Sequence, residues 1–262
     1  MCGIAGYSVS GDSSVDRTLA AQALLAGIAE RGADAVGYAW RDGAPQVRVH
    51  KQRGGAAGLL ERIAVPGDAT QLLVHVRDHT KGHPTIEANN HPIRHGDVVG
   101  IHNGIIANDE EIFAEFGFRR AEPQMTVDSE AIFALLGWDD SPRVLERLRG
   151  TMATAWLDER KPGELRLARG VGRPLWLGRG RHEVLFASTC EALELAERAL
   201  GLGLKKREVE EGTLFAVRDG RVVETGSFEP DRSYVEQRQL PAVRAADEGL
   251  RCLQRLAALA SL

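Results

Sequence analysis

The chain has 262 residues, of which 43% are hydrophobic and 27% charged, a composition typical of ordinary globular proteins. Its net charge of −4 provides no polycationic surface for nucleic acid or for an anionic membrane. Three widely spaced cysteines (Cys2, Cys190 and Cys252) indicate neither a disulfide framework nor a zinc site. We find no secretory leader and no run of about 18 apolar residues, and therefore expect a cytoplasmic protein without a membrane span.

Apolar patterns predict alternating strands and helices in the first half of the chain. Residues 1–8 are typical of a buried strand, and a helical stripe then leads to Arg31-Gly32, where the glycine suits the position after a helix end. A hairpin follows over 35–40 and 46–50, and apolar strands follow over 71–75 and 97–102. Capping patterns predict helices that begin at Asn108, near Ser129, and at Ser141-Pro142.

The second half is richer in strands. We expect strands over 153–157, 164–168, 174–177 and 183–187, a helix over 190–200, and a hairpin over 213–217 and 221–225 around Asp219-Gly220. Strands on both sides of paired helices favour an α+β fold in which helices cover antiparallel sheets. After Pro241 the pattern is that of an amphipathic helix, which either packs back on its own domain or serves as a docking or self-association element.

The second residue of the chain is a cysteine that becomes N-terminal if Met1 is removed. An N-terminal cysteine combines a thiol nucleophile with a free α-amine that acts as its general base. The α-amine has a reference pKa of about 7.7–8.0, so a useful fraction is neutral at physiological pH. Taken alone, Cys2 is equally well explained as a small residue tolerated at a chain terminus.

Polar residues follow the two central apolar strands and precede a helix. Arg77 offers a planar fork suited to a carboxylate, and Asn103 with the backbone N–H of Gly104 forms a pair of donors suited to an oxyanion. Asp128 places a carboxylate just ahead of a helix. Each position has a plainer alternative: a solvated loop, an Asn-Gly turn, and a helix cap by Asp128 or Ser129, respectively.

Six motifs occur in a fixed order: MCGIAG (1–6), RGADAVG (31–37), HVRDHTKG (75–82), NNHP (89–92), HNGIIAN (102–108) and DSE (128–130). Together they resemble the class II (N-terminal-nucleophile) glutamine amidotransferases, particularly the glutaminase domain of glucosamine-6-phosphate synthase. The resemblance covers residues 1–228 and implies a four-layer αββα sandwich. Residues 229–262 would then form a C-terminal helical extension.

The resemblance also implies an activity and a set of roles. Glutamine would be hydrolysed to glutamate and ammonia through a thioester, without a cofactor or a metal ion. The roles it implies are nucleophile for Cys2, oxyanion donors for Asn103 and Gly104, glutamine binding for Arg77, Thr80 and Asp128, and support of the site for Arg31, Asp34, Lys81 and His102.

Two positions depart from the family pattern. Asp78 replaces a tryptophan that covers the pocket and gates ammonia, and Lys81 replaces a common histidine. We recognise no synthase motif, and therefore expect a free-standing glutaminase that passes ammonia to a separate synthase or within its own oligomer. Two alternatives remain: an amidohydrolase acting on a γ-glutamyl amide of a larger metabolite, and a non-catalytic scaffold or filament subunit.

Overall fold

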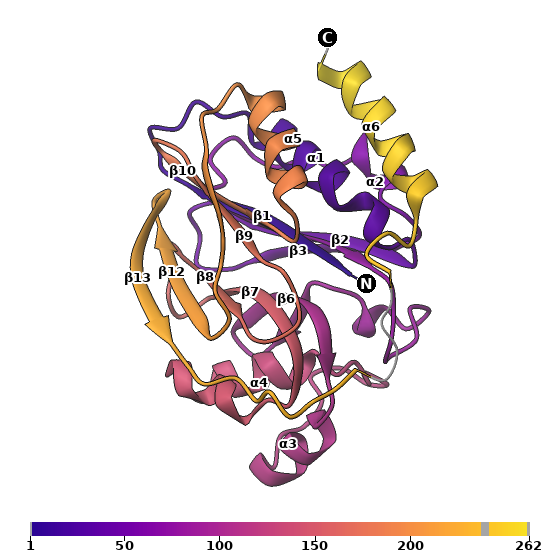
Figure 1. Ribbon diagram of the computed structural model, residues 1–262, viewed down its shortest axis with the longest axis vertical. Coiled ribbons are helices and arrows are strands. Elements are labelled where there is room, and N and C mark those ends of the chain that lie inside the picture. Colours follow the sequence, from indigo (N-terminus) through magenta and orange to yellow (C-terminus); the bar gives the residue numbers. More distant parts are fainter. Residues whose placement is uncertain (1, 237–240, 261–262) are drawn as a thin grey trace.

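The computed structural model describes residues 2–236 and 241–260, which form two antiparallel sheets enclosed by helices (Figure 1). The seven-stranded sheet has the order β11-β9-β10-β1-β4-β2-β3, and the six-stranded sheet the order β13-β12-β8-β7-β6-β5. The strands are β1 (Gly3–Val9), β2 (Ala35–Arg41), β3 (Arg48–Arg53), β4 (Gln71–Arg77), β5 (Ile93–His95), β6 (Val98–Ile106), β7 (Gly150–Asp158), β8 (Glu164–Arg169), β9 (Trp176–Arg179), β10 (Glu183–Ala187), β11 (Lys205–Glu208), β12 (Thr213–Arg218) and β13 (Arg221–Ser227).

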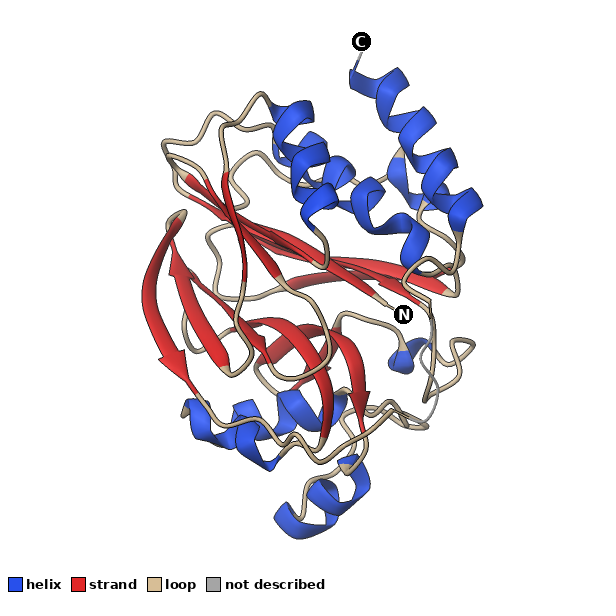
Figure 2. Ribbon diagram, in the orientation of Figure 1, coloured by secondary structure: helices blue, strands red, loops and turns tan. Residues whose placement is uncertain are grey.

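Helices cover the outer face of each sheet and produce the expected α+β sandwich of four layers (Figure 2). Over the seven-stranded sheet lie α1 (Arg17–Ile28), α2 (Ala57–Leu60), α5 (Cys190–Leu200) and α6 (Ala246–Ala260). Below the six-stranded sheet lie α3 (Asp109–Phe116), α4 (Glu130–Trp138) and the 3₁₀ turn η3 (Pro142–Arg147). Two further 3₁₀ turns are η1 (Ala29–Arg31) and η2 (Glu87–Asn89). None of the helices in the described part of the chain is long and apolar enough to cross a membrane.

The predicted helix end at Gly32 is wrong. Helix α1 ends at Ile28 and continues as η1, and Gly32 has an extended backbone with a φ of −175°. A Cβ at Gly32 would lie 2.4 Å from the carbonyl carbon and oxygen of Arg77. The glycine is therefore needed for the close approach of η1 to the end of β4, not for capping a helix.

The two central strands are longer than predicted. Strand β4 extends to Arg77 instead of ending at residue 75. Strand β6 continues through Asn103 and Gly104 instead of ending at His102, so the alternative of an Asn-Gly turn is wrong. Asn108 precedes α3 but does not cap it, because its side chain bonds the main chain of Arg147 and Arg149.

The other predicted ends are close to the observed ones. The Ser141 side chain accepts a hydrogen bond from the Arg143 N–H, as a helix cap would, but the element that it caps is a 3₁₀ turn. Strand β9 begins at Trp176, two residues later than expected. Ser129 precedes α4 without a capping hydrogen bond.

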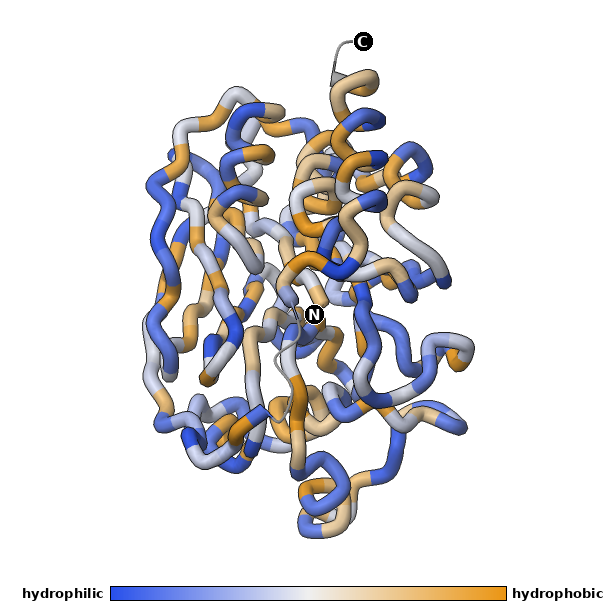
Figure 3. The backbone as a smooth tube through the Cα atoms, turned by 45° about the vertical axis from the view of Figure 1, so that its right-hand side comes forward, coloured by the Kyte–Doolittle hydropathy of each residue, from blue (hydrophilic) through white to orange (hydrophobic). Residues whose placement is uncertain are grey.

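Helix α6 has one packed face and one open face. Cys252 and Leu256 are buried against the layer that contains α1, α2 and η1, whereas Leu250 and Leu253 are 58% and 45% exposed. Figure 3 shows the alternation of hydrophobic and hydrophilic stretches along this helix. The packed face matches the first of the two alternatives for the C-terminal helix, and a docking role for the open face stays a prediction.

We predict that Gly27→Ala destabilises the fold at the contact between α1 and α5. A Cβ at Gly27 would lie 2.8 Å from both Cα and Cβ of Ala192, so the helices must separate. Overpacking of this kind costs about 1–3 kcal/mol and exceeds the gain in helix propensity of about 1 kcal/mol. Urea unfolding should show the loss, while Gly58→Ala, whose added methyl meets only Gln52 Nε2 at 3.8 Å, should keep or raise stability.

Candidate active site

Side-chain alternation directs several of the predicted site residues into the space between the sheets. Successive side chains of a strand point to opposite faces, and Ile4 on β1 and Leu73 on β4 belong to the core between the two sheets. Cys2 lies two residues before Ile4, and Arg77 lies four residues after Leu73. Both side chains therefore point to the same space, at the edge of the core. The pairing of Gly3 with Val76 places Cys2 and Arg77 at the next opposed position. Asn103 on β6 faces the same space from the other sheet, because its neighbours two and four residues earlier pack there.

A small pocket opens beside Cys2. It is lined by seven of the ten predicted site residues: Cys2, Arg77, Thr80, Lys81, His102, Gly104 and Asp128. The remaining three, Arg31, Asp34 and Asn103, do not line it.

Cys2 is held at both its main chain and its side chain. Arg31 Nε donates to the carbonyl oxygen of Cys2 over 2.9 Å, and Cys2 Sγ donates to the carbonyl oxygen of Asp78 over 3.5 Å. Burial raises the pKa of the Cys2 thiol, while the positive charge of Arg77 acts in the opposite direction. The thiol is therefore protonated at neutral pH and needs a base before it can attack a substrate.

Three buried histidines beside the nucleophile are poor candidates for that base. Burial lowers the pKa of His75 and of His102 to about 3, and it also lowers the pKa of His91. His102 Nδ1 lies 2.9 Å from Ser129 Oγ, and its Nε2 lies 3.2 Å from the Thr151 carbonyl oxygen. Neutral imidazoles whose pKa lies well below the ordinary value of 6.5 cannot accept the thiol proton readily at pH 7.

Asn103 and Gly104 have the features of a site for developing negative charge. The Asn103 side chain is fully buried, and neither of its amide atoms has a hydrogen-bond partner among the described residues. An unpaired buried amide is costly in the resting protein. Gly104 has a φ of +148°, and a Cβ there would lie 1.9 Å from the Thr151 carbonyl oxygen. Only glycine fits that backbone position.

Arg77 is fixed by hydrogen bonds to its own loop. Its guanidinium donates to Asn90 Oδ1 over 2.5 Å, to the Lys81 carbonyl oxygen over 2.8 Å, and to the Gly82 carbonyl oxygen. These bonds engage only part of the donor set of a guanidinium, which has five N–H groups. The rest can hold a substrate carboxylate with little loss of side-chain freedom.

Asp128 is a buried carboxylate whose charge acts on nearby Arg77 without a direct ion pair between them. Burial raises its pKa to about 6, the nearby Asp109 charge adds to this, and the hydrogen bond from Ile106 N to Oδ2 (2.7 Å) opposes it. Within the described residues Asp128 forms no salt bridge. A substrate ammonium group would supply the missing charge.

The remaining predicted residues shape the loop around the pocket. Asp34 accepts from the backbone N and ring Nδ1 of His79 at 2.9 and 2.6 Å, and Thr80 is exposed at the pocket. Lys81 Nζ pairs with both carboxylate oxygens of Asp109 at 2.8 Å and with Glu110 at 3.0 Å, so this charge is directed toward α3.

Sequence reasoning assigned no role to three residues that shape the site. His91 lines the pocket and stacks on His75 with a centroid distance of 4.1 Å, and Asn90 holds Arg77. Both belong to the motif 89–92, which was the available signal. Asp78 was noted only as a departure from the family pattern. No group of three or more metal-ligating side chains is placed to hold an ion in residues 2–236 and 241–260.

Comparisons with known proteins place the chain in a family. Residues 75–195 match the glutamine amidotransferase domain family. The chain is 32% identical over 210 residues to the glutamine–fructose-6-phosphate aminotransferase of Shigella flexneri, and 34% identical over 205 residues to that of Bradyrhizobium diazoefficiens. Each alignment covers 74% of this chain and 32% of the relative, so the chain spans about a third of the length of these proteins.

Solved structures with the same fold include amidotransferases of nucleotide synthesis. The glutamine phosphoribosylpyrophosphate amidotransferase of B. subtilis superimposes with a TM-score of 0.65 at 19% identity, and a structure titled the allosteric regulatory enzyme of purine biosynthesis with 0.69 at 20%. Both cover 86% of this chain and 49% of the other. The fold is that of these amidotransferases, and the chain has a cysteine at its second position. The chain belongs to the class II glutamine amidotransferases and is homologous to the glutaminase domain of glucosamine-6-phosphate synthase.

We predict that Asp128→Asn stabilises the empty protein at neutral pH. A folded-state pKa of about 6, above the ordinary 3.8, means that wild-type stability is fully present below pH 3.8 and is lost as the pH rises through about 6. The neutral amide avoids this loss, so the variant should gain about 2–3 kcal/mol at pH 8 and nothing near pH 3.5. Urea unfolding at several pH values measures the difference, and a gain that is independent of pH would contradict the assignment.

Proposed function

We propose that the protein hydrolyses the γ-amide of L-glutamine to glutamate and ammonia. The observation that carries this proposal is the juxtaposition of Cys2 with an anchored guanidinium on β4 and a buried carboxylate ahead of α4 that forms no direct salt bridge among the described residues. A free amino acid presents a carboxylate and an ammonium group, which complement Arg77 and Asp128, and glutamine's length extends its amide toward Cys2. Thr80 at the pocket is positioned to add a contact to the substrate.

The proposed reaction begins after removal of Met1. The free α-amine of Cys2 takes the thiol proton, the sulfur forms a bond to the amide carbon, and negative charge develops on the carbonyl oxygen. The Asn103 amide and the Gly104 N–H donate to that oxygen. The proton then passes from the α-amine to the departing nitrogen, and ammonia leaves. Water attacks the γ-glutamyl thioester, and glutamate and the free thiol are released.

The remaining predicted residues act through the ones that touch substrate. Arg31 holds the Cys2 carbonyl, Asp34 holds the loop that follows Arg77, and His102 packs as a neutral ring beside the pocket. We assign no metal ion or cofactor to the proposed reaction.

We further propose that the ammonia is delivered to a separate synthase or within an oligomer of this chain. The relatives named as aminotransferases are about three times as long as the matched region, which is their glutaminase part. On this proposal glutamine hydrolysis rises when the partner is added. The second candidate, hydrolysis of a γ-glutamyl amide in a larger metabolite, is favoured by the solvent exposure of Thr80 and His79 at the pocket. Turnover of γ-substituted amides relative to glutamine separates the two.

We predict that purified protein begins at Cys2 and is labelled once by a glutamine-analogue electrophile. Intact mass and peptide mapping measure both, with Cys2→Ala as the unlabelled control. Cys190 is partly exposed and serves as an internal control, because it lies outside the pocket and should stay unlabelled. Protein that retains Met1 and does not react would instead favour the non-catalytic scaffold.

We predict that Asn103→Ala lowers kcat for glutamine by about 10²–10³, because one oxyanion donor is lost. KM should change little, since the Asn103 amide acts on charge that develops after binding. Asp128→Asn should instead mainly raise KM. Glutamate release at a series of glutamine concentrations measures both constants, and a pure KM effect of Asn103→Ala would contradict the oxyanion role.

A further inference from the structure

His91 faces the pocket with two hydrogen-bonding atoms that the protein itself leaves unused. The residue is 3% exposed and lines the pocket beside Cys2. Neither of its ring nitrogens has a hydrogen-bond partner among the described residues. A buried polar atom without a partner costs free energy in the empty protein, and such atoms are uncommon in folded proteins. The His91 ring therefore has a donor and an acceptor to offer a ligand.

Neighbouring groups of the pocket wall are already engaged. His102 lines the same pocket, but both of its ring nitrogens lie within hydrogen-bond distance of neighbouring oxygens. Lys81 Nζ is paired with Asp109. Among the described side chains that line the pocket, the buried polar atoms without a partner are the two ring nitrogens of His91. A ligand that enters the pocket therefore meets an unused donor and an unused acceptor at His91.

His91 is the last of three consecutive residues that each hold one wall of the pocket. Asn89 Oδ1 accepts from the backbone N–H of Val127 over 3.0 Å, and Val127 lines the pocket. Asn90 Oδ1 accepts from the guanidinium of Arg77 over 2.5 Å. The same short segment therefore positions the guanidinium, the wall that precedes α4 and the His91 ring.

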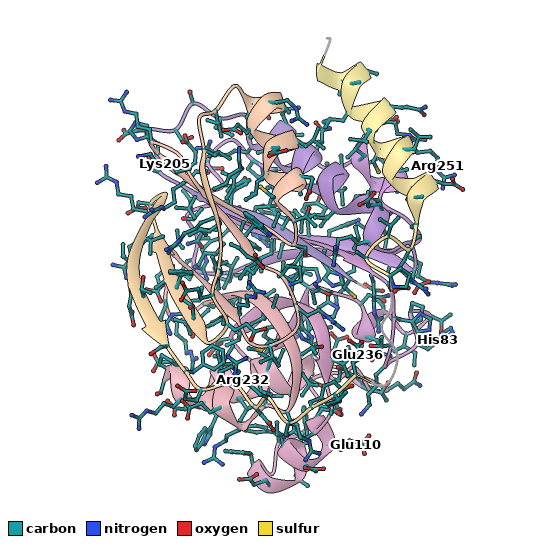
Figure 4. All side chains as sticks on the ribbon, viewed as in Figure 1. His83, Glu110, Lys205, Arg232, Glu236 and Arg251 are labelled. Carbon is teal, nitrogen blue, oxygen red and sulfur yellow. The ribbon has the colours of Figure 1, made fainter. Side chains whose placement is uncertain are left out.

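The His91 ring and its loop are held in place by their neighbours. His75 stacks on His91 with a centroid distance of 4.1 Å and an angle of 19° between the rings, and His75 Nε2 donates to the His102 carbonyl oxygen over 3.1 Å. Earlier in the loop, Asn89 Nδ2 donates over 3.3 Å to the carbonyl oxygen of His83, which is labelled at the right-hand edge in Figure 4. A ring fixed in this way offers its nitrogens without further loss of side-chain freedom.

The His91 ring is neutral, which determines the kind of group that it binds. Burial holds the pKa of His91 well below its ordinary value, and the positive charge of Arg77 acts in the same direction. A neutral imidazole has one N–H donor and one acceptor nitrogen. The acceptor nitrogen suits an amide N–H or an N–H of ammonia. Because the neutral ring does not act as an acid at pH 7, ammonia formed beside it stays uncharged.

The polar groups of glutamine leave one without a partner in the proposed reaction. Arg77 binds the α-carboxylate, Asp128 binds the α-ammonium group, and Asn103 with Gly104 binds the amide oxygen. We propose that His91 binds the remaining group, the amide nitrogen, by accepting a hydrogen bond from its N–H, and that it then holds the departing ammonia. This role rests on the proposed glutamine hydrolysis and names the residue that distinguishes an amide from other acyl groups.

His91 neither gives nor takes a proton in this scheme. The protonated α-amine of Cys2 gives its proton to the amide nitrogen, the carbon–nitrogen bond breaks, and its electron pair leaves with the nitrogen as ammonia. The carbon stays bonded to the Cys2 sulfur as the thioester. The hydrogen bond to His91 fixes the rotation of the nitrogen, so that its lone pair is directed at the proton of the α-amine.

The test compares glutamine with its methyl ketone analogue, in which a methyl group replaces the amide NH₂ and the carbonyl group is kept. Both ligands are titrated by calorimetry into the Cys2→Ala protein, which forms no thioester. This protein should bind glutamine about tenfold more tightly than the ketone, the size of one neutral hydrogen bond. Adding His91→Phe should abolish the preference and leave the Kd of the ketone unchanged, because the phenyl ring keeps the stacking on His75.

Two further variants separate recognition of the nitrogen from a general loss of structure. His50 also packs on an aromatic ring, that of Tyr38 at 5.3 Å, but lies outside the pocket, so His50→Phe should keep the preference. His91→Gln restores an acceptor and should recover part of it. A preference that survives in His91→Phe, or a ketone that binds the Cys2→Ala protein as tightly as glutamine, would overturn the proposal. Thermal unfolding should show His91→Phe at least as stable as its parent, because two unpaired buried atoms are removed.

Nitrogen NMR of isotope-labelled histidine gives a readout at the residue itself. One ring nitrogen of His91 should shift when glutamine binds the Cys2→Ala protein and stay in place when the ketone binds, and equal shifts would contradict the role. In the active protein His91→Phe should lower kcat/KM for glutamine about tenfold. If the wild-type protein releases no glutamate, the proposed function fails, and the binding comparison still decides whether His91 recognises a side-chain amide. Absence of glutamine binding would overturn both proposals.

Discussion

The antiparallel pairing of β1 with β4 is the constraint on which the site depends. It places the first residues of the chain in the middle of a sheet, with Gly3 opposite Val76 and Cys2 at the next position beside Arg77. Because both strands are buried on both faces, a slip by one residue would exchange the two faces of each strand and disrupt two cores at once. The same register that gives the fold its core therefore fixes the nucleophile.

Around that pairing, the protein keeps polar groups in places where they lower its stability. Among the described residues, the Asn103 amide and both ring nitrogens of His91 have no hydrogen-bond partner, and the buried Asp128 carboxylate forms no direct salt bridge. Unsatisfied buried groups are uncommon in folded proteins, and a cluster of them beside a thiol marks a region shaped for a ligand. Glutamine would supply the missing ammonium group and, during reaction, the oxyanion.

The C-terminal segment links the periphery of the molecule to this centre. Its main chain bonds Glu30, its Arg244 side chain bonds Asp78, and α6 buries Cys252 and Leu256 on the helical layer. Where the family pattern has an aromatic cover over the pocket, this chain has a charged residue paired with its own C-terminal part.

The sequence by itself determined the elements and the list of chemical groups. Apolar periodicity located most strands and helices. Six short motifs identified the family and predicted its site residues, because the proposed chemistry requires those residue types. Sequence patterns misplaced the features that depend on contacts between residues distant in the chain. Gly32 was assigned to a helix end, whereas the close main chain of Arg77 is what excludes a side chain at this position. Asn103 and Gly104 lie inside β6, because the pairing of β6 with β7 continues past them. The neutral state of the buried histidines, the unpaired Asp128 and the return of Arg244 to Asp78 were decided only by the tertiary structure, since burial and charge proximity arise when distant segments pack together.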